Sequence, residues 1–277
     1  MIRLERIRHK TKVPPSFRMP DLRKKAELLV ELYYEARASA KPMAFKSSGW
    51  SRAKAQLKKD TNGKCAYCEA NTEVAAHGDV EHFRPKSVYW WLAFSFDNYL
   101  YSCQICNQTY KSDSFPISGP LLTAPVMPLV KPTGAALTAL IDSLVHDALA
   151  LTDAQVSAFW QGEQGDLINP YFEDPEPLLE YALDASNEEI LVQAAPGPRA
   201  ARAFTAAHNF LGINREPLKR ARYLQYLPLA MARIAYFSTD PIAKDAGREL
   251  LLSHQQPMQP FAGMSRWYAR TWGLPTI

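Results

Sequence analysis

The spacing of apolar positions predicts two helices near the start of the chain. In "DLRKKAELLVELYYEARASA", residues 21–40, apolar side chains recur every three or four positions, as on a helix with one buried face. These positions are Leu22, Ala26, Leu29, Leu32, Tyr33 and Ala36. Asp21 is the expected N-cap. A second helix is expected from Ser48 or Ser51 to about Lys59, where the turn sequence "DTNGK" follows.

The same analysis predicts a mainly helical region after residue 135. The stretch "GAALTALIDSLVHDALAL" has helical spacing, and "PRAARAFTAAHNFLG" predicts a helix that ends at Gly212. The stretch "NREPLKRARYLQYLPLAMARIAYF" predicts a long helix capped by Asn214 and kinked at Pro228. By contrast, "LLEYALDASNEEILVQA" has two alternating runs around a polar turn, which predicts a β-hairpin.

Two segments lack any regular pattern and divide the chain. Residues 1–19 are basic and interrupted by Pro14 and Pro15, so we expect an extended arm or a short strand. Residues 117–135 carry four prolines and two glycines and are expected to form an irregular linker. We therefore expect a predominantly helical α+β protein in three parts. They are a basic arm with helices (1–60), a motif-rich core (61–120) and a mainly helical region (121–277).

Composition is that of an ordinary soluble globular protein. Of the 277 residues, 47% are hydrophobic and 22% are charged. No apolar run approaches the ~18 residues of a membrane span. The basic start of the chain lacks the apolar stretch of a secretory signal. We therefore expect a cytoplasmic protein without a membrane partner.

The net charge of +4 conceals an asymmetry between the two parts of the chain. Residues 1–120 hold 20 Lys and Arg against 12 Asp and Glu, whereas residues 121–277 hold 12 against 16. A basic part beside a mildly acidic one suggests that the first part meets a polyanion. The alternative is a solvated basic surface without a partner.

The four cysteines of the chain fall into two Cys-x-x-Cys pairs, "CAYC" and "CQIC". Such pairs commonly supply four thiolates to a tetrahedral structural zinc ion, here from Cys65, Cys68, Cys103 and Cys106. The alternatives are disulfides or a redox pair. Cytoplasmic disulfides are uncommon, and neither pair follows a thioredoxin-like strand–helix pattern. The 34 residues between the pairs imply a folded unit between them.

That interval holds a carboxylate next to a histidine, in "GDVEHFRPKS". A histidine whose pKa lies near neutrality can take a proton from water, and a divalent ion can polarise a phosphate. The alternation of Asp79, Val80, Glu81 and His82 predicts a strand end. Taken alone, His82 could equally be a buried histidine with satisfied hydrogen bonds.

The stretch resembles the HNH, or ββα-metal, endonucleases. The matching elements, in order, are Glu81, His82, Pro85, Asn98, the second cysteine pair, Asn107 and Lys111. The resemblance implies that His82 is the general base and that Asn98 holds the histidine-bearing loop in shape. It also implies that Glu81 and Asn107 bind the catalytic ion. The family often has histidine where Asn107 stands; a carboxylate with an amide oxygen suits Mg²⁺ or Mn²⁺.

Three cations flank this motif and are candidates for binding nucleic-acid phosphates: Arg84, Lys86 and Lys111. The alternative is that they are solvated charges. His77 is a lesser candidate for a metal or phosphate contact. The neighbouring aromatic side chains are expected in the core rather than as a platform for stacked bases: Tyr89, Trp90 and Trp91.

A narrower resemblance covers more of the chain. The segments "CAYCE", "DVEHFRPKS", "NYLYSCQICNQTYKSDSFP", "LINPYFEDPEPLL" and "HNFLGINREPLKRAR" are similar to the PtuB-like HNH nucleases of Septu-type and retron-linked antiphage systems. This resemblance implies a partner ATPase of the ABC/SMC-like class, and our hypothesis is that the helices after residue 135 dock onto it. Those helices could instead only complete the core.

The sequence therefore suggests a metal-dependent endonuclease of an antiphage system. DNA is the expected substrate, with RNA, including tRNA, as the alternative. The rival interpretations are a zinc-dependent nucleic-acid-binding module and a structural subunit without catalysis.

Overall fold

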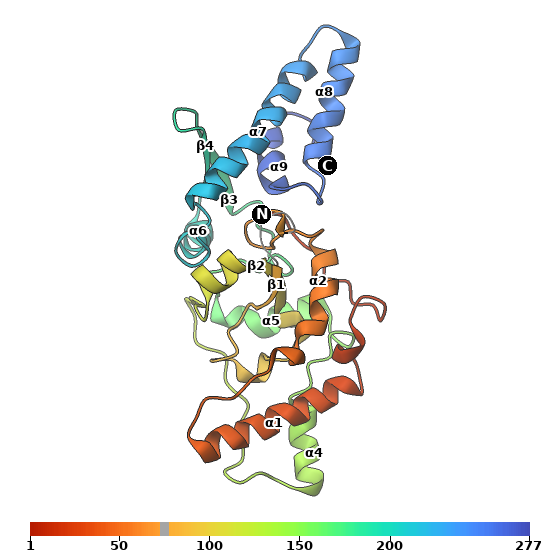
Figure 1. Cartoon of the computed structure of the whole chain (residues 1–277), viewed down its shortest axis with the longest axis vertical. Helices are drawn as coiled ribbons and strands as arrows, with labels where there is room; N and C mark the ends of the chain where they lie inside the picture. Colours follow the sequence, from red (N-terminus) through yellow and green to blue (C-terminus); the bar gives the residue numbers. More distant parts are fainter. Residues whose placement is uncertain (73–77) are drawn as a thin grey trace.

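The computed structural model describes residues 1–72 and 78–277, which fold into helices and two small sheets (Figure 1). One end of the elongated molecule carries α1 and α4, and the opposite end carries the α7–α8 pair. The sheet of β1 and β2 lies between them and packs on α2. The helices are α1 (Asp21–Ser39), α2 (Lys54–Asp60), α4 (Gly134–Ser143), α5 (Asp153–Trp160), α6 (Pro198–Leu211), α7 (Glu216–Tyr236), α8 (Pro241–His254) and α9 (Ala262–Thr271).

The N-terminal arm is held by a few buried residues, while most of its charged side chains are exposed. Residues 1–8 have no regular secondary structure, and the first regular element is the 3-10 turn Pro15–Phe17, which the sequence analysis did not expect. Arg6 is 3% exposed and donates from Nη2 to the carbonyl of Tyr99 at 2.7 Å, beneath β2. The expected helices follow, with one correction. Asp21 is the first residue of α1 and pairs with Lys24, and it does not cap the helix.

The first sheet positions the motif. Strands β1 (Gly78–His82) and β2 (Tyr99–Cys103) pair antiparallel, with Glu81 opposite Leu100 and His82 opposite Tyr99. After β2 the chain turns into a π-helical segment, Ile105–Lys111. The expected strand over residues 79–82 is present. The order strand, strand, helical segment places the second cysteine pair at the end of β2.

The C-terminal part follows the predicted pattern with two differences. The predicted hairpin is present as β3 (Leu179–Asp184) and β4 (Glu189–Ala194), and α6 ends at Gly212, whose φ of +56° favours glycine. The predicted helix over residues 134–151 stops at Ser143. Asn214 does not cap α7; its side chain exchanges two 2.8 Å hydrogen bonds with the backbone of Val192. An amide that can satisfy both groups of a strand residue is thereby used to fix β4.

The α7–α8 pair depends on a close approach at Gly247. A Cβ atom at this position would lie 2.5 Å from the backbone nitrogen of Tyr236 and 2.8 Å from the carbonyl oxygen of Ala232. Both neighbours are backbone atoms of α7, which cannot rotate away. Pro228 lies inside α7, which continues to Tyr236. Within the described residues, no helix is long and apolar enough to cross a membrane.

We predict that Gly247→Ala destabilises the protein despite the better helix propensity of alanine. The methyl group must separate α7 from α8, and such overpacking costs about 1–3 kcal/mol of unfolding free energy. Gly162→Ala is the matched control, because nothing lies within 4 Å of its added Cβ. Urea unfolding of both variants measures the difference. Equal stability of Gly247→Ala and the wild type would show that the helices are further apart.

Candidate functional site

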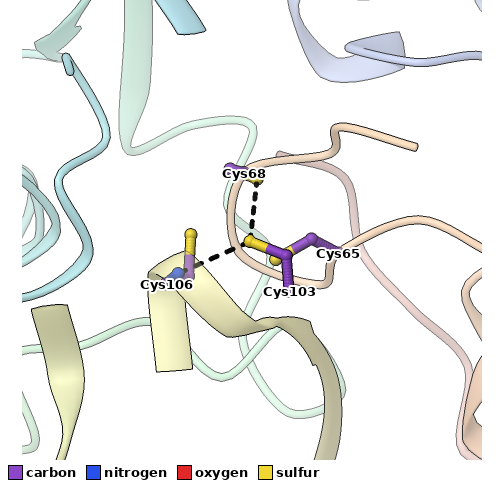
Figure 2. Close-up of side chains that lie close together, drawn as sticks. All are labelled: Cys65, Cys68, Cys103 and Cys106. Atoms are coloured by element: carbon purple, nitrogen blue, oxygen red, sulfur yellow. Dashed lines mark hydrogen bonds between the residues drawn. The ribbon is translucent and has the colours of Figure 1, made fainter. Parts of the chain in front are cut away.

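The four cysteines form one buried cluster, which we call the cysteine cluster (Figure 2). Their sulfur atoms all lie within 4.8 Å of one another, and the Cys68 and Cys103 sulfurs are 4.0 Å apart. Four ligands at ~2.3 Å around a tetrahedral zinc ion are separated by about 3.8 Å. None of the four is in a disulfide, so that alternative is wrong. The donor set and its spacing fit a structural metal ion such as zinc.

Arg215 lies beside the cysteine cluster and was not anticipated. Its guanidinium contacts the sulfurs of Cys106 at 3.4 Å, Cys68 at 3.8 Å and Cys103 at 3.9 Å. Burial alone would lower the pKa of Arg215, but the negative charge of Cys106 and Cys68 raises it above its usual value. The arginine therefore stays charged and offsets part of the excess negative charge that four thiolates place on one Zn²⁺.

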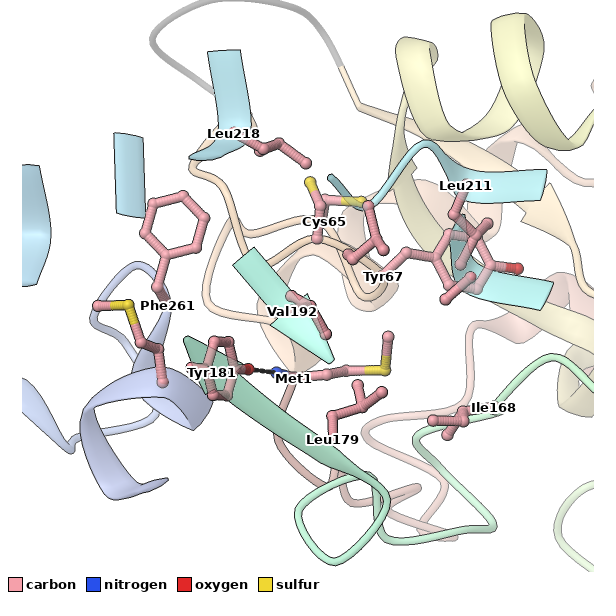
Figure 3. Close-up of a cluster of buried hydrophobic side chains, with 14 of the residues drawn as sticks. Met1, Cys65, Tyr67, Ile168, Leu179, Tyr181, Val192, Leu211, Leu218 and Phe261 are labelled. Carbon is pink, nitrogen blue, oxygen red and sulfur yellow. Dashed lines mark hydrogen bonds between the residues drawn. The ribbon is translucent and has the colours of Figure 1, made fainter. Parts of the chain in front are cut away.

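The cysteine cluster lies in the largest core cluster of the described residues (Figure 3). There Cys65 and Tyr67 pack with Val192 of β4, Leu211 of α6 and Leu218 of α7. The amino group of Met1 donates to the hydroxyl of Tyr181 at 2.8 Å in the same cluster. A metal ion bound by the cysteine cluster would therefore lie where the motif-rich core packs against the C-terminal part.

A pocket of about 310 Å³ beside β1 brings together four of the predicted site residues. Glu81 and His82 come from β1, Lys86 from the following loop, and Asn107 from the segment after β2. The pocket is lined by Trp50, Val80, Glu81, His82, Pro85, Lys86, Asn107, Gln108, Ser112 and Asp113. Residues separated by up to 26 positions in the motif thus line one cavity.

His82 is held in one orientation at the wall of this pocket. Its Nε2 is 3.0 Å from the carbonyl oxygen of Ala93, so this nitrogen carries the hydrogen, because a carbonyl only accepts. Trp50 and Tyr99 contact the ring edge to face, with centroids at 4.8 and 5.0 Å. Burial, and then the charge of Lys86, lower the pKa of His82 to about 3. The imidazole is therefore neutral at pH 7, and its Nδ1 holds a free lone pair.

Asn98 is fully buried and holds the loop that follows His82. Its Oδ1 accepts from the backbone N–H of Arg84 at 2.9 Å, and its Nδ2 donates to the Arg84 carbonyl at 2.9 Å. The backbone N–H of Phe83 also donates to the Asn98 carbonyl at 2.9 Å. The loop is therefore pinned at two consecutive residues.

Glu81 forms a buried ion pair with Lys111. The Nζ of Lys111 lies 2.5 Å from Oε1 of Glu81, and it also donates to the His82 carbonyl at 3.1 Å. Burial raises the pKa of Glu81, and the charge of Lys111 opposes that rise. Lys111 is 0% exposed, so the expected phosphate contact is corrected. The side chain faces the interior and holds Glu81 and the β1 backbone.

Arg84 requires the same correction. It is buried, and its Nε donates to Glu163 at 2.6 Å. The guanidinium packs over the Trp160 ring at 4.3 Å. With both contacts in place, the Arg84 side chain is not accessible to a phosphate. Of the three flanking cations, only Lys86 lines the pocket.

The structure places in the pocket three polar side chains that the sequence analysis did not single out. Asp113, Gln108 and Ser112 line the pocket from the segment that follows the second cysteine pair. The polar run "YKSDS" was the available signal. Each of the three carries a side-chain oxygen, as do Glu81 and Asn107, and oxygen is the kind of ligand that Mg²⁺ and Mn²⁺ prefer. Tyr89 and Trp91 are buried, as expected, and His77 lies outside the described residues.

We predict about one zinc ion per chain, bound so that folding depends on it. Zinc binding at such a site supplies on the order of 10–16 kcal/mol, which becomes folding free energy. Cys103→Ser removes one ligand and is expected to give insoluble or disordered protein. Metal analysis and circular dichroism before and after chelation test this. Zinc-free protein with an unchanged spectrum would contradict it.

The chain was compared with known proteins. No protein-family model matches it, and no solved structure matches it. It is 45% identical over 74 residues to the Septu protein PtuB of Bacillus mycoides (strain KBAB4). The match covers 22% of this chain and 25% of that protein, so it spans about a quarter of the length of the relative. Over that stretch, the chain is related to PtuB.

Proposed function

We propose that the protein is a metal-dependent HNH endonuclease that hydrolyses phosphodiester bonds in nucleic acid and serves antiphage defence. The observation that carries the proposal is the shared pocket of Glu81, His82 and Asn107 beside the β1–β2 pair. Their order in the sequence resembles the HNH motif. The relationship to a Septu protein supports the defence role.

In this proposal each side chain has a separate task. His82 accepts the proton of the attacking water at Nδ1, because Nε2 is committed to Ala93. Asn98 keeps the histidine-bearing loop in position through Arg84. Glu81 and Asn107 hold a Mg²⁺ or Mn²⁺ ion, which polarises the phosphate and stabilises the leaving oxygen when bound. Lys86 contacts the phosphate.

One observation favours the non-catalytic alternative. Glu81 already has a cation at 2.5 Å, in Lys111, as a structural carboxylate would. A zinc-dependent nucleic-acid-binding subunit needs no free metal ligand at this position. The two functions differ in whether His82 matters for anything beyond folding.

We predict that His82→Ala abolishes cleavage of plasmid DNA or RNA in Mg²⁺ or Mn²⁺ and leaves binding intact. Loss of a general base lowers the rate by ~10²–10⁴. His208→Ala, on the exposed side of α6, is the matched control and should cut like the wild type. Gel assays with and without added divalent ion measure both. Equal cutting by the two variants would remove His82 from the mechanism, and no cutting by the wild type would favour the binding subunit.

We propose further that a partner ATPase of the ABC/SMC-like class docks on α7. Leu224, Leu227, Met231 and Ile234 recur every three or four residues on this helix and are 41–67% exposed. The stripe continues at Phe237, which is 64% exposed. Contiguous exposed apolar surface of this kind is typical of a protein interface. The opposite face of α7 packs on β4 and α8, so the helix can serve both the core and a partner.

We predict that an ABC/SMC-like ATPase co-purifies with the wild-type chain from its host and that Met231→Glu/Ile234→Glu abolishes this co-purification. Two buried charges without partners oppose an interface of at least ~1,000 Å². Ala201→Glu/Thr205→Glu, at exposed positions of α6, is the matched control. Pull-down followed by size-exclusion chromatography compares the variants. An ATPase that binds both variants equally would place the interface elsewhere.

A further inference from the structure

A second, larger groove of about 860 Å³ adjoins the candidate active-site pocket. Lys86 and Asp113 line both cavities, so the groove opens onto the pocket. One wall is the C-terminal half of α1, and the other is the segment of residues 40–45 that follows it. Trp90 lies between these walls and the loop that carries Lys86.

The groove is positively charged. Arg37 and Lys41 are exposed on its walls, and Lys86 lies where it meets the pocket. Among residues 1–72 and 78–277, none of the three forms a close ion pair with a carboxylate, and Lys86 lies over the Trp50 ring at 5.4 Å with Glu81 near enough to feel its charge. Asp113 is the one acidic residue in the lining. An anionic occupant would therefore meet three unpaired cations leading to the pocket.

The same groove is lined by aromatic rings that pack against buried aromatic side chains. The rings of Tyr33 and Trp90 lie 5.1 Å apart, centroid to centroid, and both side chains are half-buried. Trp90 rests edge to face on buried Trp91 at 5.9 Å. Phe45 contacts buried Phe94 in the same manner at 6.1 Å. Because these rings are already packed, they can stack on a ligand with little further loss of side-chain entropy.

We infer that this groove binds a single strand of nucleic acid and leads it to the pocket of His82. The inference rests on the proposed nuclease function and names its substrate class. Cations that follow a backbone, interleaved with aromatic rings that stack bases, are the means by which proteins bind unpaired strands. A groove of this volume is comparable to a pocket for a drug-sized ligand, so it encloses only a short stretch of an unpaired strand, and it has no room for that stretch together with its paired strand. Trp90 would therefore stack on bases in the groove and also take part in the packing that the sequence analysis expected.

The test measures binding in the absence of added Mg²⁺ or Mn²⁺, so that cleavage plays no part. Fluorescence anisotropy of the full-length protein is followed with labelled ten-nucleotide single strands of DNA and of RNA, and with a duplex of the same length. We expect tighter binding of a single strand than of the duplex, and the DNA and RNA arms show which sugar is preferred. A chelator is omitted because it would remove a metal ion from the cysteine cluster.

Two variants assign the binding to the groove. Arg37→Glu/Lys41→Glu is expected to weaken binding and to reduce the salt slope by about 0.7 for each lost phosphate contact. Trp90→Ala is expected to weaken binding about 5- to 150-fold through lost stacking, and Trp90→Phe to restore part of it. Lys244→Glu/Arg248→Glu reverses the same two residue types on exposed positions of α8 and should bind like the wild type.

The outcomes separate this inference from the nuclease proposal. Groove-dependent binding without cleavage upholds the groove and rejects the nuclease. Cleavage by the wild type with unchanged binding by Arg37→Glu/Lys41→Glu and Trp90→Ala upholds the nuclease and rejects the groove. Equal affinity for duplex and single strand also rejects it. Displacement of the strand by polyglutamate at equal charge would mean that the groove binds any polyanion, which overturns the inference.

Discussion

Four sulfur atoms within 4.8 Å of one another in an apolar core are stable only if something neutralises or protonates them. Arg215 contacts three of the sulfurs with its guanidinium, and the spacing of the four sulfurs suits a tetrahedral metal ion. This constraint governs the rest of the structure because the sulfurs come from two distant segments. The arginine comes from a third segment, between α6 and α7. Removing the charge balance would separate all three.

The cysteine cluster and the candidate active-site pocket share the same elements. Cys103 is the last residue of β2, whose partner strand ends at His82. Cys106 and Asn107 are neighbours in the segment after β2, one facing the sulfurs and the other the pocket. The cluster thus fixes the orientation of two walls of the pocket without touching a substrate. Rigid support of this kind is what a site on short strands requires.

Local patterns in the sequence predicted the elements well, and distant pairings poorly. The two Cys-x-x-Cys pairs, the β3–β4 hairpin and the glycine at the end of α6 were all predicted, because each depends on neighbouring residues. Arg84 was expected to contact phosphate, but its partner, Glu163, lies 79 residues further along the chain. Arg215 was missed for the same reason, since it meets sulfurs more than 100 residues away.

Because Lys111 pairs with Glu81, the two candidate metal sites differ in how far the fold would depend on a bound ion. At the cysteine cluster, a bound metal ion would supply folding free energy, so the fold would depend on it. At Glu81, the ammonium group of Lys111 already neutralises the carboxylate, so the β1 strand end is complete before any divalent ion arrives. An ion that binds there competes with a resident counterion and gains less than it would from a bare carboxylate. Occupancy of that position would therefore follow the concentration of the ion, and the ion pair with Lys111 would keep the end of β1 in place without it.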